Sequence, residues 1–158
     1  NIIDTYSLGS FELIETPKEP KWFERVDNIV LVSNETALEA MATTAQSLGY
    51  AVSIIASDMY DAPPELIQRF ISRAKNHSVI LGGGESRLTI TVPNGIGGRN
   101  QHIALTAAPQ LIEGQLFASI ASDGLDNGES AGALVDSSTQ HRALAAGFNL
   151  REESAKFN

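Results

Sequence analysis

Hydrophobic positions along this chain form short apolar runs and helical stripes that alternate between residues 28 and 147. A short apolar run bounded by polar residues or glycines is typical of a buried strand. Apolar residues spaced three or four apart are typical of a helix with one buried face. The pattern predicts strands over residues 28–33, 51–56, 78–81 and 116–121. It predicts helices over residues 37–48, 66–74, 103–112 and 139–146.

Local residue chemistry sets the ends of these helices. Asn34 is the predicted N-cap of the first helix, and Gly49 is expected to end it because glycine readily adopts the backbone angles of a helix C-terminus. Pro63 and Pro64 suit the first turn of the second helix, where no backbone donor is needed. Pro109 is expected to kink or shorten the third helix.

The sheet is expected to be mixed. Residues 87–92 alternate between apolar and polar side chains, which predicts a half-exposed strand. Too few residues separate it from the 78–81 strand for a crossover helix, so these two should pair antiparallel. The predicted fold class is therefore α/β, a three-layer α/β/α domain with a mixed, mostly parallel sheet. Residues 1–27 are expected to be a lead-in segment before a single domain over residues 28–158.

Composition narrows the class of partner. The 158 residues carry a formal net charge of −8, which opposes binding to nucleic acid or to an anionic membrane through bulk charge. The chain has no cysteine, which excludes disulfides, thiol nucleophiles and cysteine-ligated zinc. It has no run of about 18 apolar residues and no signal-peptide pattern at its start. We therefore expect no membrane partner and a cytoplasmic location.

The most informative stretch is residues 94–101, where glycines lead from a strand-like segment into a predicted helix. Glycines let the backbone approach a ligand closely, and a helix start offers unpaired N–H groups and positive potential. An arginine adds a planar cation that suits carboxylate or phosphate, although a cation at this end of a helix is locally unfavourable. The pattern therefore predicts an anionic partner. The predicted anion site comprises Gly97, Gly98, Arg99, Asn100 and Gln101.

A second candidate directly follows the 78–81 strand. Three consecutive glycines end this strand, and Glu85 follows them. Exposed amides at Gly83 and Gly84 could cradle an oxyanion or a phosphate, with Glu85 fixing the loop or a metal ion. The alternative is a hairpin turn, for which two adjacent glycines are common.

The third candidate is an acidic loop over residues 122–129, which follows the 116–121 strand. Asp123 and Asp126 could hold Mg²⁺ through water or position a hydroxyl group, and the alternative is a solvated acidic turn. An EF-hand loop is excluded because Leu125 stands where an oxygen ligand is required.

Other catalytic motifs fit less well. The chain has no Gly-Lys-Ser/Thr sequence, which excludes a Walker loop, and the glycine-rich stretch lacks the last glycine of the dinucleotide fingerprint. Residues 128–132 match the nucleophile-elbow pattern of serine hydrolases. An acidic loop precedes them in place of a strand, so a serine hydrolase is disfavoured.

Taken in order, these segments resemble the C-terminal part of the glycerate 2-kinase family, including its MOFRL domain. That family is also named hydroxypyruvate reductase. Residues 28–57 look like the strand–helix–strand that begins this region. The other matching stretches are Gly-Gly-Glu at 83–85, Gly-Ile-Gly-Gly-Arg-Asn-Gln at 95–101, Ser-Asp-Gly-Leu-Asp at 122–126 and Ala-Gly-Ala-Leu-Val-Asp at 131–136.

The resemblance implies ATP-dependent phosphorylation of glycerate at its 2-hydroxyl, in a cleft between two α/β domains. Arg99 matches the family's functional arginine, and Arg99 and Asp123 are the expected catalytic residues. ATP and Mg²⁺ are the implied cofactors, and the ligand would be a small anionic 2-hydroxy acid or a nucleotide. The residues expected to bind this anion or substrate are Gly83, Gly84, Glu85, Gly97, Gly98, Asn100, Gln101 and Asp126.

Departures from the family limit what the chain is expected to do alone. Nothing in it corresponds to the family's larger N-terminal domain with its catalytic lysine. We therefore expect it to be inactive alone and to associate with a kinase domain or with itself. His102 stands where the family usually has a glutamate. The alternatives are a non-catalytic small-anion or nucleotide binding module that has lost the kinase domain, and an interaction domain whose motifs survive only as turns.

Overall fold

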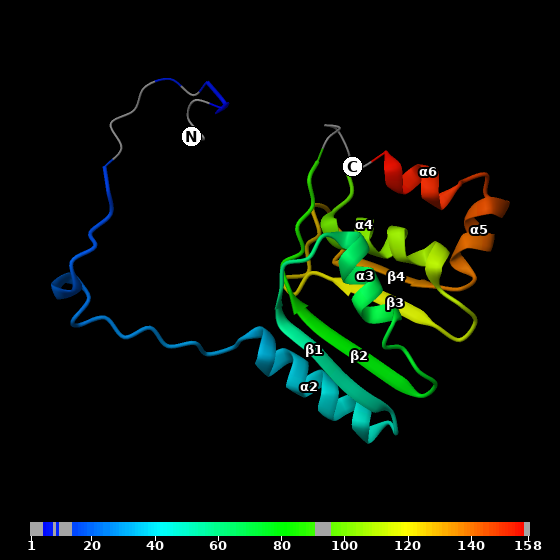
Figure 1. Ribbon diagram of the computed structural model, residues 1–158, viewed down its shortest axis with the longest axis horizontal. Helices are drawn as coiled ribbons and strands as arrows, with labels where there is room; N and C mark the ends of the chain where they lie inside the picture. Colours follow the sequence, from blue (N-terminus) through cyan, green and yellow to red (C-terminus); the bar gives the residue numbers. More distant parts are fainter. Residues whose placement is uncertain (1–4, 8, 10–13, 91–95, 157–158) are drawn as a thin grey trace. The chain divides into compact units, whose positions relative to one another are not determined.

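A computed structural model of the chain describes residues 5–7, 9, 14–90 and 96–156. Figure 1 traces the whole chain from its N-terminus to its C-terminus. The chain divides into two compact units, Asn1–Leu31 and Val32–Asn158. The first unit contains the short 3-10 helix η1 (Pro20–Trp22), which begins with a proline. The second unit contains the candidate site.

The first half of the second unit is a parallel pair of strands with two helices. In chain order its elements are α2 (Asn34–Ser47), β1 (Ala51–Met59), α3 (Pro63–Ile71) and β2 (Ser78–Gly84). Strands β1 and β2 pair in parallel, with Ala51 opposite Ser78 and, after two register shifts, Met59 opposite Gly84. The carboxyl ends of both strands therefore lie at one edge, where α/β folds commonly bind ligands.

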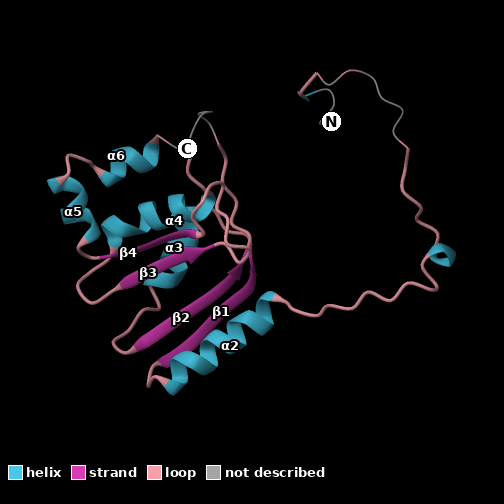
Figure 2. Cartoon of the chain, turned by 180° about the vertical axis from the view of Figure 1, so that it is seen from behind, coloured by secondary structure: helices cyan, strands magenta, loops and turns pink. Residues whose placement is uncertain are grey.

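The second half is an antiparallel pair of strands with three α-helices and one 3-10 helix. Its elements are α4 (Arg99–Ala107), the 3-10 helix η2 (Ala108–Gln110), β3 (Leu116–Ile120), β4 (Gly132–Asp136), α5 (Thr139–Ala145) and α6 (Leu150–Ala155). Strand β3 runs antiparallel to β4, with Phe117 opposite Val135. Figure 2 shows helix α2 beside β1 and helix α4 beside β3 and β4.

The α/β class predicted from the sequence is confirmed. Parallel and antiparallel pairing are both present, in two separate two-stranded sheets among the described residues. No helix in the described part of the chain is long and apolar enough to cross a membrane. The lead-in over residues 1–27 and the single domain over residues 28–158 stay predictions about domain organisation.

The local prediction was wrong at two strands. Residues 28–32 form no strand, and Ile29 and Leu31 are 77% and 86% exposed, so the apolar run does not lie in a core. Residues 85–90 also form no strand, and β2 pairs with β1 instead. The remainder of the predicted 87–92 strand, and positions 94 and 95 of the glycine-rich stretch, lie outside the described residues. Strand β4 and helix α6 carried no prediction.

The ends of two helices follow the chemistry of their first residues. Ser33, rather than Asn34, caps α2: its hydroxyl accepts from the Thr36 backbone N–H while the Thr36 hydroxyl accepts from the Ser33 N–H. This reciprocal arrangement satisfies two donors that the helix leaves unpaired. Pro63 opens α3 as predicted.

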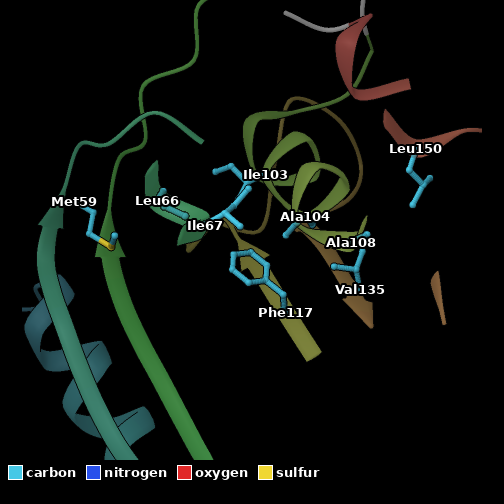
Figure 3. Packing of buried hydrophobic residues seen from close by; sticks show 10 residues of the cluster. Met59, Leu66, Ile67, Ile103, Ala104, Ala108, Phe117, Val135 and Leu150 are labelled. Atoms are coloured by element: carbon cyan, nitrogen blue, oxygen red, sulfur yellow. The ribbon is translucent and has the colours of Figure 1, made fainter. Parts of the chain in front are cut away.

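The core lies between α3, α4 and the antiparallel sheet. Figure 3 shows Ile67 of α3, Ile103 of α4 and Phe117 of β3 directed toward one another. Ile67 is fully buried and Ile103 nearly so. Since burying a side chain of this size contributes about 1.5–3 kcal/mol, these contacts fix α4 against the sheet. The first turn of α4, which carries the predicted anion site, is therefore held by a packed core.

Candidate functional site at the start of helix α4

The N-cap residue of helix α4 has no side chain that could cap the helix. Gly98 occupies the N-cap position and has no side chain to accept a hydrogen bond from the first turn. The Asp126 carboxylate takes this role from a distant loop: Asn100 N–H donates to Oδ1 across 3.0 Å, and Gln101 N–H donates to Oδ2 across 2.8 Å. A carboxylate at this position also interacts favourably with the helix dipole. The helix-start N–H groups predicted to bind an external anion therefore already hold one from the chain itself.

Side-chain amides strengthen the same contact. Asn100 Nδ2 donates to Asp126 Oδ1 at 3.1 Å, and Gln101 Nε2 donates to the Asp126 carbonyl oxygen at 3.1 Å. Ser119 of β3 donates its hydroxyl to Asn100 Oδ1 at 2.7 Å. Asn127 Nδ2 donates to the Gly97 carbonyl at 3.0 Å. The first turn of α4, the acidic loop and strand β3 thus form one hydrogen-bonded network.

The missing side chain of Gly98 makes this contact possible. Gly98 is buried, and a Cβ atom at this position would overlap the Asp126 carbonyl and carboxylate. Gly97 is different, because among the described residues a Cβ there would have one neighbour within reach, Gln101 Oε1 at 4.0 Å. Gly98 is therefore required by the close approach of Asp126, whereas Gly97 has room for a side chain.

The electrostatics of Asp126 follow from this environment. Asp126 is only 4% exposed, and burial by itself raises the pKa of its carboxyl group. The hydrogen bonds from the backbone and side chains of Asn100 and Gln101 favour the charged form and outweigh burial. The net effect lowers the pKa of Asp126 below its ordinary value, so the carboxylate is charged near neutral pH.

Arg99 points away from this network. Its Nη1 donates to Glu85 Oε1 and to the Ser86 carbonyl, both at 3.0 Å. The Arg99 side chain is 41% exposed and that of Glu85 is 73% exposed, so solvent screens the pair. Among the described residues, Nε and Nη2 of Arg99 have no hydrogen-bond partner. The guanidinium therefore keeps donors that can reach an anion from solvent.

The glycines that end β2 are packing residues in this structure. A Cβ on Gly82 would come within 2.8 Å of Met59 and Phe70 side-chain atoms, and one on Gly84 would overlap the Met59 backbone. Gly84 also has a φ angle of +147°, which side chains rarely tolerate. A Cβ on Gly83 would lie 3.3 Å from the Asn34 side chain at the start of α2. The close approach of these neighbours accounts for the three glycines without a phosphate.

Asp123 lies at the tip of the acidic loop and is exposed. Its Oδ1 accepts from the Leu125 N–H at 3.1 Å, and Gly124 between them has a φ angle of +84°. This is the geometry of an Asx-type turn. The described residues contain no group of three or more acidic, histidine or cysteine side chains that could hold a metal ion.

The structure thus separates the predicted site residues into three groups. Those around the start of α4 are brought together: Glu85, Gly97, Gly98, Arg99, Asn100, Gln101 and Asp126. Gly83 and Gly84 lie at the end of β2 and pack against α2 and β1, and Asp123 lies on the same loop as Asp126. Two residues of the network, Ser119 and Asn127, were not predicted. Ser119 belongs to no motif, and Asn127 lies in the acidic loop without any feature that singles it out, so only the three-dimensional arrangement reveals their contacts.

A comparison with known protein families assigns the chain to one of them. The profile of the MOFRL family matches residues 78–158, which is about half of the chain. The chain belongs to the MOFRL family. The matched region of this MOFRL chain includes β2, Arg99 and the acidic loop, so it contains every predicted site residue.

Named relatives of the MOFRL chain are glycerate kinases. A glycerate 2-kinase of Pyrococcus horikoshii is 28% identical in an alignment 159 positions long, which spans 93% of this chain and 36% of that protein. A D-glycerate 2-kinase of Thermotoga maritima is 28% identical in an alignment 163 positions long, which spans 92% of this chain and 39% of that protein. The chain therefore spans a little over a third of the length of these relatives.

Solved structures agree with the sequences. The crystal structure of the glycerate kinase of Thermotoga maritima matches with a TM-score of 0.76 at 28% identity, over 99% of this chain and 41% of that chain. A solved protein of Pyrococcus horikoshii OT3 matches with a TM-score of 0.71 at 26% identity, over 85% of this chain and 34% of that chain. The resemblance to the glycerate 2-kinase family predicted from the sequence is confirmed.

Proposed function

We propose that this chain is the MOFRL-containing part of a glycerate 2-kinase-like enzyme, in which Arg99 holds negatively charged oxygens of the substrate. The observation that carries the proposal is the placement of Arg99 on the first turn of α4. Its side chain is partly exposed, and of its guanidinium nitrogens only Nη1 is held by described residues of the chain. A guanidinium with unpaired donors suits carboxylate and phosphate oxygens, which it can bind through two parallel hydrogen bonds.

The reaction would transfer the γ-phosphoryl group of ATP to the 2-hydroxyl of glycerate. The glycerate oxygen forms a bond to the γ-phosphorus, the bond from this phosphorus to the bridging oxygen breaks, and ADP leaves. Catalysis of such transfers depends on positioning and on neutralising charge, which is the role given to Arg99. The exposed Asp123 carboxylate would position the hydroxyl group and accept its proton.

The described residues fit Mg²⁺ only in part. Asp126 is poorly placed to hold a cation, since it is buried and its carboxylate already accepts three hydrogen bonds. Of the two aspartates in the acidic loop, Asp123 keeps an exposed carboxylate. Mg²⁺ is commonly held by one or two carboxylates together with substrate phosphates, so the nucleotide would bring most of its ligands. No step assigned here to Arg99 depends on the metal ion.

Phosphoryl transfer would also need groups from outside this chain. Two hollows on the described surface have volumes of about 330 and 480 Å³, and the predicted site residues line neither of them. We therefore propose that the site lies between this domain and a second domain, and that the chain is inactive alone. The alternative proposal, a non-catalytic small-anion or nucleotide binding module, gives the same ligand binding without any phosphoryl transfer at all.

Ligand titration of the isolated chain tests the proposal. We expect D-glycerate and inorganic phosphate to shift the NMR resonances of residues 99–101 with affinity no better than about millimolar, since two or three charge-assisted hydrogen bonds must offset the cost of association. Arg99→Ala should abolish these shifts. Arg142→Ala is the matched control, because Arg142 is also an exposed arginine with one carboxylate partner, Asp136 at 3.6 Å.

Three outcomes decide between the proposals. Shifts that survive Arg99→Ala, or that disappear equally in Arg142→Ala, would remove the support for an anion site at Arg99. Micromolar binding would favour the binding-module alternative. Formation of phosphoglycerate from ATP and D-glycerate by the chain alone would contradict the expected dependence on a second domain.

A further inference from the structure

We infer that Asp126 is a positioning residue, which fixes the first turn of α4 and so aims Arg99, and that it binds neither substrate nor metal. Nothing in the family comparison assigns this role, and the sequence pattern predicted a ligand-binding one. The role of Arg99 in this inference rests on the proposed function. The hydrogen bonds that hold Asp126 do not depend on the proposed function.

Every polar atom of Asp126 is used within the chain. Its backbone N–H donates to the Ser130 carbonyl at 2.8 Å, and its carbonyl accepts from the side chain of Gln101. Its carboxylate accepts three hydrogen bonds, two at Oδ1 and one at Oδ2. With 4% of the residue exposed, the remaining lone-pair site at Oδ2 has almost no access for a substrate hydroxyl or a metal ion.

Arg99 lies between residues that this network holds. Gly98 on one side is pressed against Asp126, and Asn100 on the other donates twice to its carboxylate. The loop is tied a second time through Asn127, whose side chain donates to the Gly97 carbonyl. The backbone of Arg99 is therefore held on both sides, and its side chain projects toward Glu85.

A second consequence concerns how anions are recognised. A helix start whose N–H groups are free can bind phosphate by itself. Here the Asn100 and Gln101 N–H groups already hold the Asp126 carboxylate, so an incoming anion meets the guanidinium instead. The Arg99 guanidinium would then bind the anion, and its planar shape favours ligands that offer two oxygens side by side.

Removal of the carboxylate tests the inference in the full chain. We expect Asp126→Asn to increase amide hydrogen exchange at residue 100 or residue 101 by at least about tenfold, because one of the two acceptor oxygens is replaced by a donor. The Arg99 Nε–H resonance should shift, and phosphate binding at Arg99 should weaken at least about threefold. Glu129→Gln is the matched control, since it removes an exposed charge from the same loop and should change none of these quantities.

A second variant distinguishes a missing acceptor from general damage. Asp126→Ala leaves a space beside Gly98 lined by the donors of Asn100 and Gln101, and a small carboxylate has the chemistry to fill it. Added formate should therefore restore exchange protection at residues 100 and 101, while the same concentration of chloride should not. A merely structural requirement for aspartate would give no such rescue.

The unmodified protein provides a readout that needs no variant. The amide resonances of residues 100 and 101 should titrate together as acid protonates Asp126, with a pKa below the ordinary value for aspartate. Wild-type protection of both amides in Asp126→Asn, or amides that do not titrate with Asp126, would overturn the inference. If phosphate and D-glycerate fail to bind the wild type while Asp126→Asn still loses amide protection, the proposed function fails and the positioning of this turn stands.

Discussion

The Arg99 guanidinium donates to the Glu85 carboxylate across 3.0 Å, and this carboxylate comes from the segment that directly follows strand β2. The pair joins the two glycine-rich stretches that the sequence singled out separately. Because Glu85 is largely exposed, the pair is a weak interaction that an incoming anion can replace. Glu85 therefore places a negative charge next to the Nε and Nη2 donors of Arg99, to which the proposed function assigns substrate oxygens.

Replacing Glu85 by glutamine should increase the affinity of the chain for anions. An exposed ion pair contributes about 0.2–1 kcal/mol, so removing the competing charge should tighten binding of inorganic phosphate or D-glycerate by up to about fivefold. The measurement is an NMR titration followed at the Arg99 Nε–H resonance. The gain should shrink at high salt, because salt screens exposed charges.

The control for this change is Glu129→Gln, which removes one negative charge from the acidic loop without touching Arg99. It should leave the affinity at Arg99 nearly unchanged. Weaker binding in Glu85→Gln would contradict the prediction, because it would mean that Glu85 holds Arg99 in a productive orientation rather than competing for it.

Two adjacent glycines should respond differently to alanine. Gly98→Ala should destabilise the fold by about 1–3 kcal/mol, because the new Cβ atom would overlap Asp126 and force the loop away from α4. Gly97→Ala is the matched control and should cost no more than about 0.5 kcal/mol, since the position is open and its substitution touches no core contact. Urea denaturation of both variants at neutral pH measures the difference. Equal stabilities would contradict the close packing of Asp126 against Gly98.

The fold could be predicted where local pattern and tertiary context agree. The helical stripe of α3 and its two opening prolines led to the correct element. The apolar run at residues 28–32 predicted a strand equally well, yet strand formation needs a partner edge, which no local pattern can supply. Residues 132–136 form strand β4, but the sequence predicted no strand there. A short strand next to a polar loop gives too few positions to establish a period.

Only part of the candidate site could be predicted from the sequence, because its contacts join residues far apart along the chain. An arginine at a helix start predicted an anionic partner, and in the structure Arg99 pairs with the Glu85 carboxylate of the chain itself. The sequence could not say whether the charge belongs to a ligand or to the chain. Asp126 lies 25 residues from Gln101, and Glu85 lies 14 residues from Arg99. Contacts of this sequence separation leave no periodic signal.

A substitution in the glycines that end β2 can distinguish a packing role from a phosphate-binding role. Gly84→Ala should destabilise the fold by about 1–3 kcal/mol, since its φ angle is unfavourable for alanine and the Met59 backbone leaves no room for a Cβ atom. A phosphate-binding loop would instead lose affinity with little change in stability. Thermal unfolding and phosphate titration of the same variant separate the two outcomes. Gly114→Ala is the control for backbone strain alone, because Gly114 has a φ angle of +83° but no neighbour within 4 Å.

His102 offers a prediction about pH. It lies on α4, is only 6% exposed, and its Nδ1 atom is buried without a hydrogen-bond partner among the described residues. Burial lowers the pKa of this histidine below its usual 6.5, because the charged form is poorly solvated there. The unfolded chain therefore binds a proton more readily than the folded chain. Protonation of His102 in the unfolded chain therefore leaves the free energy of unfolding unchanged above pH 6.5 and lowers it as the pH drops below 6.5.

We expect His102→Leu to stabilise the fold, and to do so more at pH 5 than at pH 8. At pH 8 the gain should be about 1–3 kcal/mol, the cost of an unpaired buried polar atom. Below pH 6.5 the gain should grow by at most about 1.4 kcal/mol per pH unit, as the unfolded wild type takes up a proton that the leucine variant cannot. Urea denaturation at both pH values measures this, with His141→Leu as the exposed-histidine control that should change stability by less than about 0.5 kcal/mol. An equal gain at both pH values would mean that His102 is already protonated or solvated in the folded chain.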